Sequence, residues 1–350
     1  MILAVGTLLV LLAGFVGGVF GAAVGALAAL ALSGLAIVVG ELAQLFIDGR
    51  AVGLVATLGV DAAPLTAGPL SALGLGPLLG PHVAFAGGVG AAAYAGRKGT
   101  VDTAFRYHQA KQIRQPLYDR PKALAVGGVF GLLGVGLAAV GSLLPVDAVA
   151  FAVVGSALLA RLTIGYPVFG RFDGTKILDM SPFRAGAYWG DGGHETSEGI
   201  AGRHVVEPWQ PSYYEPLAVL GVGVVGGVLA AAIALAFESV LLPFGLALAS
   251  LFGVVGGLRV SGYPVPVTHH IALPAAIGAL AVGGTLPVGL LVGTAFGVTG
   301  AMLGELLQRV VYAHGDTHVD PGFGALLVAS ILVAILVFAG VFDASAVPYL

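Results

Sequence analysis

The stretch that decides the fold is residues 2–46, which read ILAVGTLLVLLAGFVGGVFGAAVGALAALALSGLAIVVGELAQLF. It contains no ionisable side chain before Glu41. A transmembrane helix needs about 20 consecutive, mostly apolar residues, so this stretch is too long for a single span. We therefore predict a helical hairpin over 3–23 and 26–46, with a re-entrant segment as the alternative.

The composition of the whole chain points the same way. Of its 350 residues 58% are hydrophobic and only 9% are charged, whereas about 25% are charged in a typical soluble domain. The mean hydropathy is +1.00. So few charges cannot cover the surface of a soluble enzyme, and they cannot form the basic surface of a nucleic-acid binder. We therefore expect the chain to lie in a lipid bilayer and to bind no nucleic acid. The chain has no cysteine, which excludes disulfides, iron–sulfur clusters and thiolate zinc sites.

The same criterion of length and apolarity predicts an all-α, multi-pass membrane protein with ten transmembrane helices. After the hairpin, the predicted spans are 75–96, 122–144, 148–166, 216–237, 239–259, 265–284, 286–309 and 321–342.

The distribution of basic residues predicts the orientation in the cell membrane, because Lys and Arg are enriched in cytoplasmic loops. With loops 97–121, 167–215 and 310–320 in the cytoplasm, every Lys and Arg except Arg50 lies on the inner side. This count includes Arg161, near an inner helix end, from where we expect its side chain to snorkel to water. Both termini are then extracytoplasmic. The excess of Arg over Lys is typical of a GC-rich prokaryotic genome.

Five short matches in the same order indicate an internal duplication. The matched pairs are 16–19 with 225–228, 34–36 with 245–247, 81–85 with 269–273, 141–144 with 304–307, and 146–147 with 319–320. They relate the first five spans (residues 1–166) to the last five (216–350), with the polar loop 167–215 between the halves. Because five is odd, the two copies must cross the membrane in opposite senses, as in the inverted repeats of secondary transporters.

Glycines at three- and four-residue spacing, such as Gly127, Gly131 and Gly134, predict faces on which helix backbones approach closely. Such faces serve packing within the bundle, or association into a homo-oligomer.

Broken helices at the starts of spans three and eight are the first candidate site. Residues 261–274 contain His269 and His270, with two prolines before them and a third after them. The matched segment 74–82 is also rich in glycine and proline, and it ends at His82. Non-helical backbone at membrane depth is tolerated only when it is buried in protein or lines a wet cavity. We therefore expect these three histidines to lie on a substrate or ion pathway, with helix-start or surface roles as the alternative.

The second candidate is the segment 314–320, where His314, Asp316, His318 and Asp320 alternate with other residues. Histidine together with carboxylate suits a divalent metal ion such as zinc, manganese or iron. The alternative for Asp320 is helix capping, because it precedes Pro321 and the last span.

Two carboxylates inside predicted spans, Glu41 and Glu305, are further pathway candidates, because ionisable residues in membrane helices are often functional. Glu305 has an alternative, an ion pair with Arg309 four residues later. In the long inner loop, Asp191, His194, Glu195 and Glu198 suit either a further cation site or a loop that covers the inner face.

These features favour a secondary transporter or channel-like permease for a small solute or ion, coupled to protons or another cation. We identify no catalytic residue and no serine–histidine–aspartate set. One alternative is a non-transporting membrane subunit that docks in a larger complex through its inner loops. A third reading is an intramembrane metalloenzyme that uses His314, Asp316 and His318.

Overall fold

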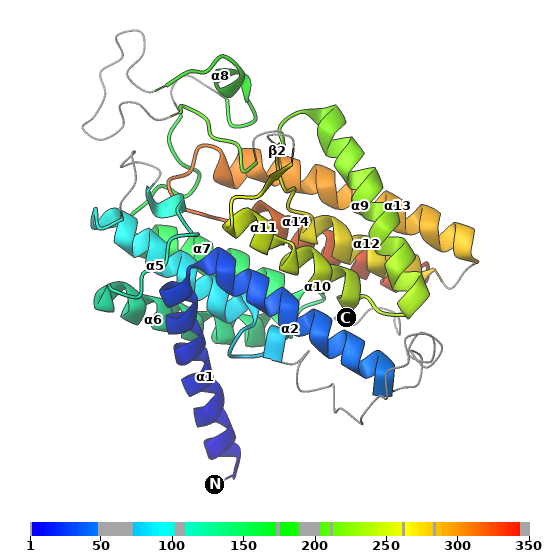
Figure 1. Ribbon diagram of the computed structural model, residues 1–350, viewed down its shortest axis with the longest axis horizontal. Helices are drawn as coiled ribbons and strands as arrows, with labels where there is room; N and C mark the ends of the chain where they lie inside the picture. Colours follow the sequence, from blue (N-terminus) through cyan, green and yellow to red (C-terminus); the bar gives the residue numbers. More distant parts are fainter. Residues whose placement is uncertain are drawn as a thin grey trace.

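The computed structural model describes residues 2–47, 73–101, 109–172, 176–188, 204–210, 213–260, 263–282 and 285–343. Across these ranges the regular structure is helical, apart from one antiparallel pairing of two-residue strands, β1 (Arg259–Val260) with β2 (Tyr263–Pro264). Figure 1 shows the helices as one bundle, with the connecting segments gathered mostly at its two ends.

The first half of the chain supplies α1 (Ile2–Val24), α2 (Ala26–Ile47), the π-helical turn η1 (Pro81–Phe85), α5 (Ala86–Arg97), η2 (Gln109–Lys111), α6 (Pro121–Gly141) and α7 (Ala148–Ile164). A short helix, α8 (Ser181–Arg184), lies in the connection between the halves. The second half supplies α9 (Pro216–Phe237), α10 (Leu241–Ala249), α11 (Leu251–Val255), α12 (His269–Ala281), α13 (Leu286–Leu307), η4 (Gln308–Tyr312) and α14 (Pro321–Phe338).

Six of the described helices are long and apolar enough to cross a membrane, as expected of a multi-pass membrane protein. They are α1, α2, α6, α9, α13 extended by η4, and α14. In α1 only 28% of the most apolar window is buried against other helices, so most of its side chains need lipid around them.

The other predicted spans also contain helices, but shorter ones: α5 with η1, α7, α10 with α11, and α12. α12 has 13 residues, which at 1.5 Å per residue gives about 20 Å, less than the ~30 Å of a hydrocarbon core. Proline explains the shortening at the start of α12, because Pro264 and Pro266 cannot donate backbone hydrogen bonds and hold the residues before them extended. The count of ten spans therefore stays a prediction.

Each half has a core of closely packed helices. In the first half α1 packs on α5 and α6, and α7 packs on the same two helices. In the second half α9 packs on α12 and α13, and α14 packs on those two. The halves meet where α2 lies against α10 and where α7 lies against α14, and both views show α2 reaching from the first half towards the second.

The first two helices are separated by a single residue, Gly25, which has φ of +92°. The loop before α6 lies against this corner: Leu27 N–H donates to the Ile113 carbonyl at 3.2 Å, and Leu117 N–H donates to the Ala22 carbonyl at 3.0 Å. A Cβ on Gly25 would lie 2.7 Å from the Arg114 carbonyl oxygen. The long apolar stretch therefore forms two helices with a left-handed glycine between them.

We expect Gly25→Ala to lower the free energy of unfolding by about 1–2 kcal/mol, because an L side chain is strained at positive φ. Thermal denaturation of the detergent-solubilised protein measures this. Gly136→Ala is the control, since it lies within α6 and a Cβ there would meet nothing within 4 Å. Equal melting temperatures for the two variants would contradict the expectation.

Candidate functional site

A polar cavity of about 330 Å³ lies where segments from both halves meet. Its apolar wall comes from Leu27 and Leu30 of α2 and from Leu251 and Val254 of α11. Its polar lining comes from segments 111–114 and 207–210, from Arg259 and from the buried residues His269, His318 and Asp320. We call this space the polar cavity.

The floor of the polar cavity is a buried carboxylate between two imidazoles. His269 Nε2 lies 3.5 Å from Asp320 Oδ1, and His318 Nε2 lies 3.3 Å from Asp320 Oδ2. Asp320 is also the N-cap of α14, because its Oδ1 accepts a hydrogen bond from Phe323 N–H at 2.9 Å. Burial by itself would raise the pKa of Asp320, but the hydrogen bonds and charges of His269 and His318 hold that pKa below its ordinary value.

The neighbouring histidine, His270, points to a different set of partners. Its Nε2 is hydrogen-bonded to the Tyr213 hydroxyl, and the Trp209 ring lies 5.4 Å from its own, centre to centre. The Gln308 side chain fixes this aromatic group, because it accepts from Trp209 N–H at 2.8 Å and donates to the Tyr213 carbonyl at 2.8 Å. His269 and His270 therefore belong to two different polar clusters. The centres of their own rings are 5.5 Å apart.

Cations surround the upper part of the polar cavity. The buried Lys111 Nζ donates to the Tyr312 carbonyl at 2.9 Å and lies 3.3 Å from Glu207 Oε2. Arg114 and Arg259 line the cavity and are exposed to solvent. The polar cavity thus has a positive rim and a floor made of one carboxylate and two imidazoles.

The segment behind the floor is held by Arg161, which is 0% exposed. Its guanidinium donates to the Val311 carbonyl at 2.6 Å, to the Thr317 carbonyl at 2.9 Å and to the Val168 carbonyl. The expectation that Arg161 snorkels to water is therefore wrong. Its donors are satisfied inside the protein by the carbonyls of the 311–317 turn, and a guanidinium with five N–H donors suits that task.

The other predicted pathway residues lie apart from this floor. The His82 carbonyl packs against Gly134 of α6. Glu41 Oε2 accepts a hydrogen bond from the Ser239 hydroxyl at 2.6 Å. Glu305 pairs with Arg309 through two bonds of 2.8 Å from Nε, which is its alternative role.

The metal hypothesis for segment 314–320 gains no support from this arrangement. Among the described residues no group of three or more His, Asp or Glu side chains is arranged to hold a metal ion. The side chains of His318 and Asp320 are in contact, whereas the His314 ring packs on Phe172, with ring centres 4.6 Å apart and the planes tilted by 41°. The capping role of Asp320 is present, as described above. The candidate loop residues Asp191, His194, Glu195 and Glu198 lie outside the described residues.

Sequence reasoning missed three residues of the site: Lys111, Trp209 and Gln308. Lys111 counted only towards the cytoplasmic charge bias, and neither Gln308 nor Trp209 was singled out. The proximity of Trp209 to His269 and His270 arises from contacts across 60 residues of chain, and no local pattern in the sequence carries that information.

The six long apolar helices define a helical, multi-pass membrane protein. Over residues 1–350 the chain matches a family of unknown function, DUF7973, and it belongs to that family. No curated protein and no solved structure matches it.

We expect Asp320→Asn to lower the free energy of unfolding by about 1–3 kcal/mol, because a buried charged partner of two imidazoles is lost while asparagine still caps the helix. The lowered pKa of Asp320 means that this contribution is present above about pH 3.9 and is lost as the pH falls from there towards the folded value. Thermal unfolding at neutral pH, followed by tryptophan fluorescence, measures it.

Asp147→Asn is the matched control. Asp147 caps α7 in the same way, through Ala150 N–H at 2.7 Å, but burial raises its pKa more than its backbone hydrogen bonds to Ala150 and Val149 lower it. A neutral side chain there should leave stability unchanged or raise it. An equal loss in both variants would show that Asp320 is only a cap.

Proposed function

We propose that this protein is a permease in which a small solute or ion passes between two inverted five-helix halves, 1–166 and 216–350. The polar cavity is the inner vestibule, and His269, Asp320 and His318 carry a coupled proton. The observation on which the proposal depends is the polar cavity itself, with a buried carboxylate between two imidazoles at the junction of the halves.

The helix neighbours support the repeat. If α1, α2, α5, α6 and α7 are matched in order with α9, α10, α12, α13 and α14, each helix core has the same packing partners in both halves. The two most extensive helix contacts between the halves, α2 with α10 and α7 with α14, then join matched helices. A pseudo-two-fold axis produces this pattern, because it places equivalent elements against each other.

Close contacts between small residues within each half also support the repeat. A methyl group placed on Gly127 would lie 2.7 Å from Ala22 Cβ, and one placed on Gly293 would lie 2.6 Å from Ala231 Cβ. Ala22 and Ala231 occupy matched places in α1 and α9, next to the repeated Val-Gly-Gly-Val sequence. The same small-residue contact therefore joins the first and fourth helix of each half.

A second pair of contacts involves the broken helices. Gly134 of α6 lies against the His82 carbonyl, and Gly300 of α13 lies against the His270 carbonyl. His82 and His270 are matched by the alignment of 81–85 with 269–273. We infer that these two positions are equivalent and lie at opposite depths in the bilayer.

The contact between α2 and α10 is reciprocal. A Cβ on Gly34 would meet Leu248, and a Cβ on Gly245 would lie 2.8 Å from Ile37. Leu248 is three residues beyond Gly245, and Ile37 is three residues beyond Gly34. Each glycine therefore faces the counterpart of its own neighbour, as in an isologous interface.

The contacts among the loops support the predicted grouping of loops 97–121, 167–215 and 310–320 at one end of the bundle. Segments assigned to the cytoplasm bind one another: Lys111 to Tyr312, Glu207 N–H to the Ala313 carbonyl at 3.1 Å, and Arg171 N–H to the His314 carbonyl at 3.1 Å. At the other end of the bundle Asp343 N–H donates to the Ala281 carbonyl at 3.0 Å. This division fits an alternation in which both termini are extracytoplasmic.

The floor offers a simple coupling step. A proton on His269 Nε2 or His318 Nε2 faces the Asp320 carboxylate, and its loss removes one of the two imidazole partners of that buried negative charge. Solute binding under the positive rim changes the field on these imidazoles, so proton uptake and solute binding are linked.

The alternative is a non-transporting subunit, and one observation favours it. The N-terminal half of α1 projects from the bundle (Figure 1), with Leu8, Leu9 and Leu12 exposed. A partner helix could pack there. A subunit of this kind would show no solute flux when reconstituted alone.

The absence of native cysteine makes the orientation directly testable. We expect single cysteines at Ser142 and Glu238 to react with a membrane-impermeant maleimide from the outside of intact cells. Cysteines at Gln112 and Leu258 should react only after the membrane is opened. All four positions are exposed at helix ends. Labelling of Gln112 and Ser142 from the same side would overturn the ten-span topology.

We expect purified protein in proteoliposomes to transport at least one member of a panel of cations, anions and neutral metabolites, and to do so faster under a pH gradient. Asp320→Asn should reduce the pH-driven rate by about tenfold or more, as expected for the loss of a proton-transfer group. Asp147→Asn should keep the wild-type rate. Flux that is identical with and without the gradient in all three proteins would remove proton coupling, and no flux in any of them would favour the subunit.

A further inference from the structure

A single extended segment, residues 264–268, separates the polar cavity from a second, apolar space. Val265 and Val267 line the polar cavity, whereas Pro266 and Thr268 line the apolar one. This alternation is that of an extended chain, whose successive side chains point to opposite faces. Val267 N–H donates to the Gln210 side chain at 2.9 Å, which ties the segment to the polar side. We call residues 264–268 the strap.

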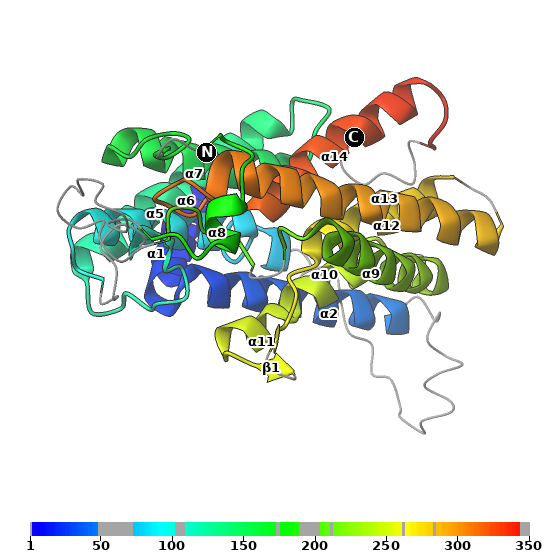
Figure 2. The same ribbon diagram turned by 90° about the horizontal axis from the view of Figure 1, so that it is seen from above.

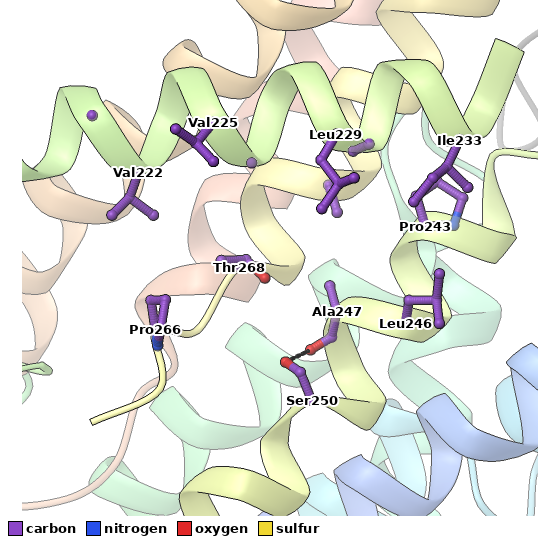
Figure 3. A pocket seen from close by; sticks show the side chains of 14 residues that line it. Val222, Val225, Leu229, Ile233, Pro243, Leu246, Ala247, Ser250, Pro266 and Thr268 are labelled. Carbon is purple, nitrogen blue, oxygen red and sulfur yellow. Dashed lines mark hydrogen bonds between the residues drawn. The ribbon is translucent and has the colours of Figure 1, made fainter. Parts of the chain in front are cut away.

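The second space is a groove of about 480 Å³ between α9, α10 and the start of α12 (Figure 3). Its walls are Val, Leu, Ile, Ala, Gly and Pro, with Ser250 and Thr268 as the only hydroxyl-bearing side chains. The Ser250 hydroxyl donates to the Ala247 carbonyl at 2.7 Å, as the dashed line shows. Val225 and Leu229 at the rim are 69% and 60% exposed. An opening of this kind on a membrane helix faces lipid, and its chemistry suits an alkyl chain.

The equivalent place in the first half is filled by the protein itself. Gly17 of α1 matches Gly226 of α9 in the repeated Val-Gly-Gly-Val sequence. A Cβ on Gly17 would collide with the Leu78 carbonyl, whereas the nearest atom to a Cβ on Gly226 is Ile271 Cγ2 at 3.1 Å. Residues near Leu78 therefore close the first groove with an apolar stretch of chain. The matching stretch of the second half is the strap, and it does not come as close to Gly226 as Leu78 comes to Gly17, so the second groove stays open. An elongated apolar ligand has the shape of this opening.

The rim on the other side of the strap is positive. Arg114 and Arg259 are exposed there, and Arg114 donates to the Val254 carbonyl at 3.4 Å. Guanidinium groups bind phosphate through several N–H donors at once. A basic group beside an anionic leaflet contributes about 1 kcal/mol of attraction per Arg.

We propose that an anionic phospholipid of the inner leaflet binds across the strap. Its phosphate lies on Arg114 and Arg259 at the rim of the polar cavity, and one acyl chain lies in the groove between α9 and α10. The strap is a wall one chain thick, with the headgroup of the lipid on one side and the acyl chain on the other. This binding goes beyond the proposed function, because it requires no transport.

The test is thermal stabilisation of detergent-solubilised full-length protein by added lipid, since a ligand of the folded state raises the melting temperature by mass action. We expect phosphatidylglycerol to raise it, phosphatidylcholine with the same chains to bind about tenfold more weakly or worse (~1.4 kcal/mol), and glycerol phosphate to have no effect. Equal effects of the two lipids would overturn the role of the arginines. Equal stabilisation by glycerol phosphate would overturn the lipid as ligand.

Variants separate the two ends of the site. Ser250→Phe fills the groove, and Arg259→Gln removes a rim charge. Each should weaken phosphatidylglycerol binding by about tenfold. Val129→Phe on the exposed face of α6 and Arg184→Gln in α8 are the controls, since both are exposed and line neither space. Wild-type lipid binding by Ser250→Phe would overturn the proposal. Asp320→Asn should still bind the lipid, so a failure of transport and a failure of lipid binding are distinguishable.

Discussion

Close approach of helix backbones is the constraint on which the structure depends. In a bilayer the hydrophobic effect does not hold helices together, so van der Waals contact and interhelical hydrogen bonds must do so. Gly18 of α1 lies against Gly127 and Gly131 of α6 with no room for a side chain, and a Cβ on Gly297 of α13 would lie only 2.5 Å from Gly227 Cα of α9. These contacts set the separation of the helices in each half, and through it the position of every polar group between them.

Where the backbone is not helical, hydrogen bonds from polar side chains hold the segments together, as glycine contacts do between the helices. Arg161 binds the carbonyls of the 311–317 turn, Lys111 binds the Tyr312 carbonyl, and Gln308 binds the loop at Trp209 and Tyr213. Each of these contacts joins segments 95 or more residues apart. The cavity exists because these side chains satisfy the carbonyls of turns that a helix would otherwise satisfy internally.

Much of the fold could be predicted because apolar length and proline act locally. The break at Gly25, the starts of α6, α9 and α14 at prolines, and the capping by Asp147 and Asp320 follow from neighbouring residues in the sequence. The site was harder, because its members are joined by side chains from distant segments. His269 and Asp320 were each singled out, but their pairing was not, and the burial of Arg161 ran against a local expectation of exposure.

The two capping aspartates also bear on how such a site persists. Asp147 and Asp320 each start a helix, so replacing either by an apolar residue would damage the folding of its half. The side chain at position 320 must accept the hydrogen bond from Phe323 N–H, so this position is restricted to residues that cap a helix. Asparagine meets this requirement as well as aspartate, so capping keeps an oxygen atom beside His269 and His318 but does not by itself keep the negative charge.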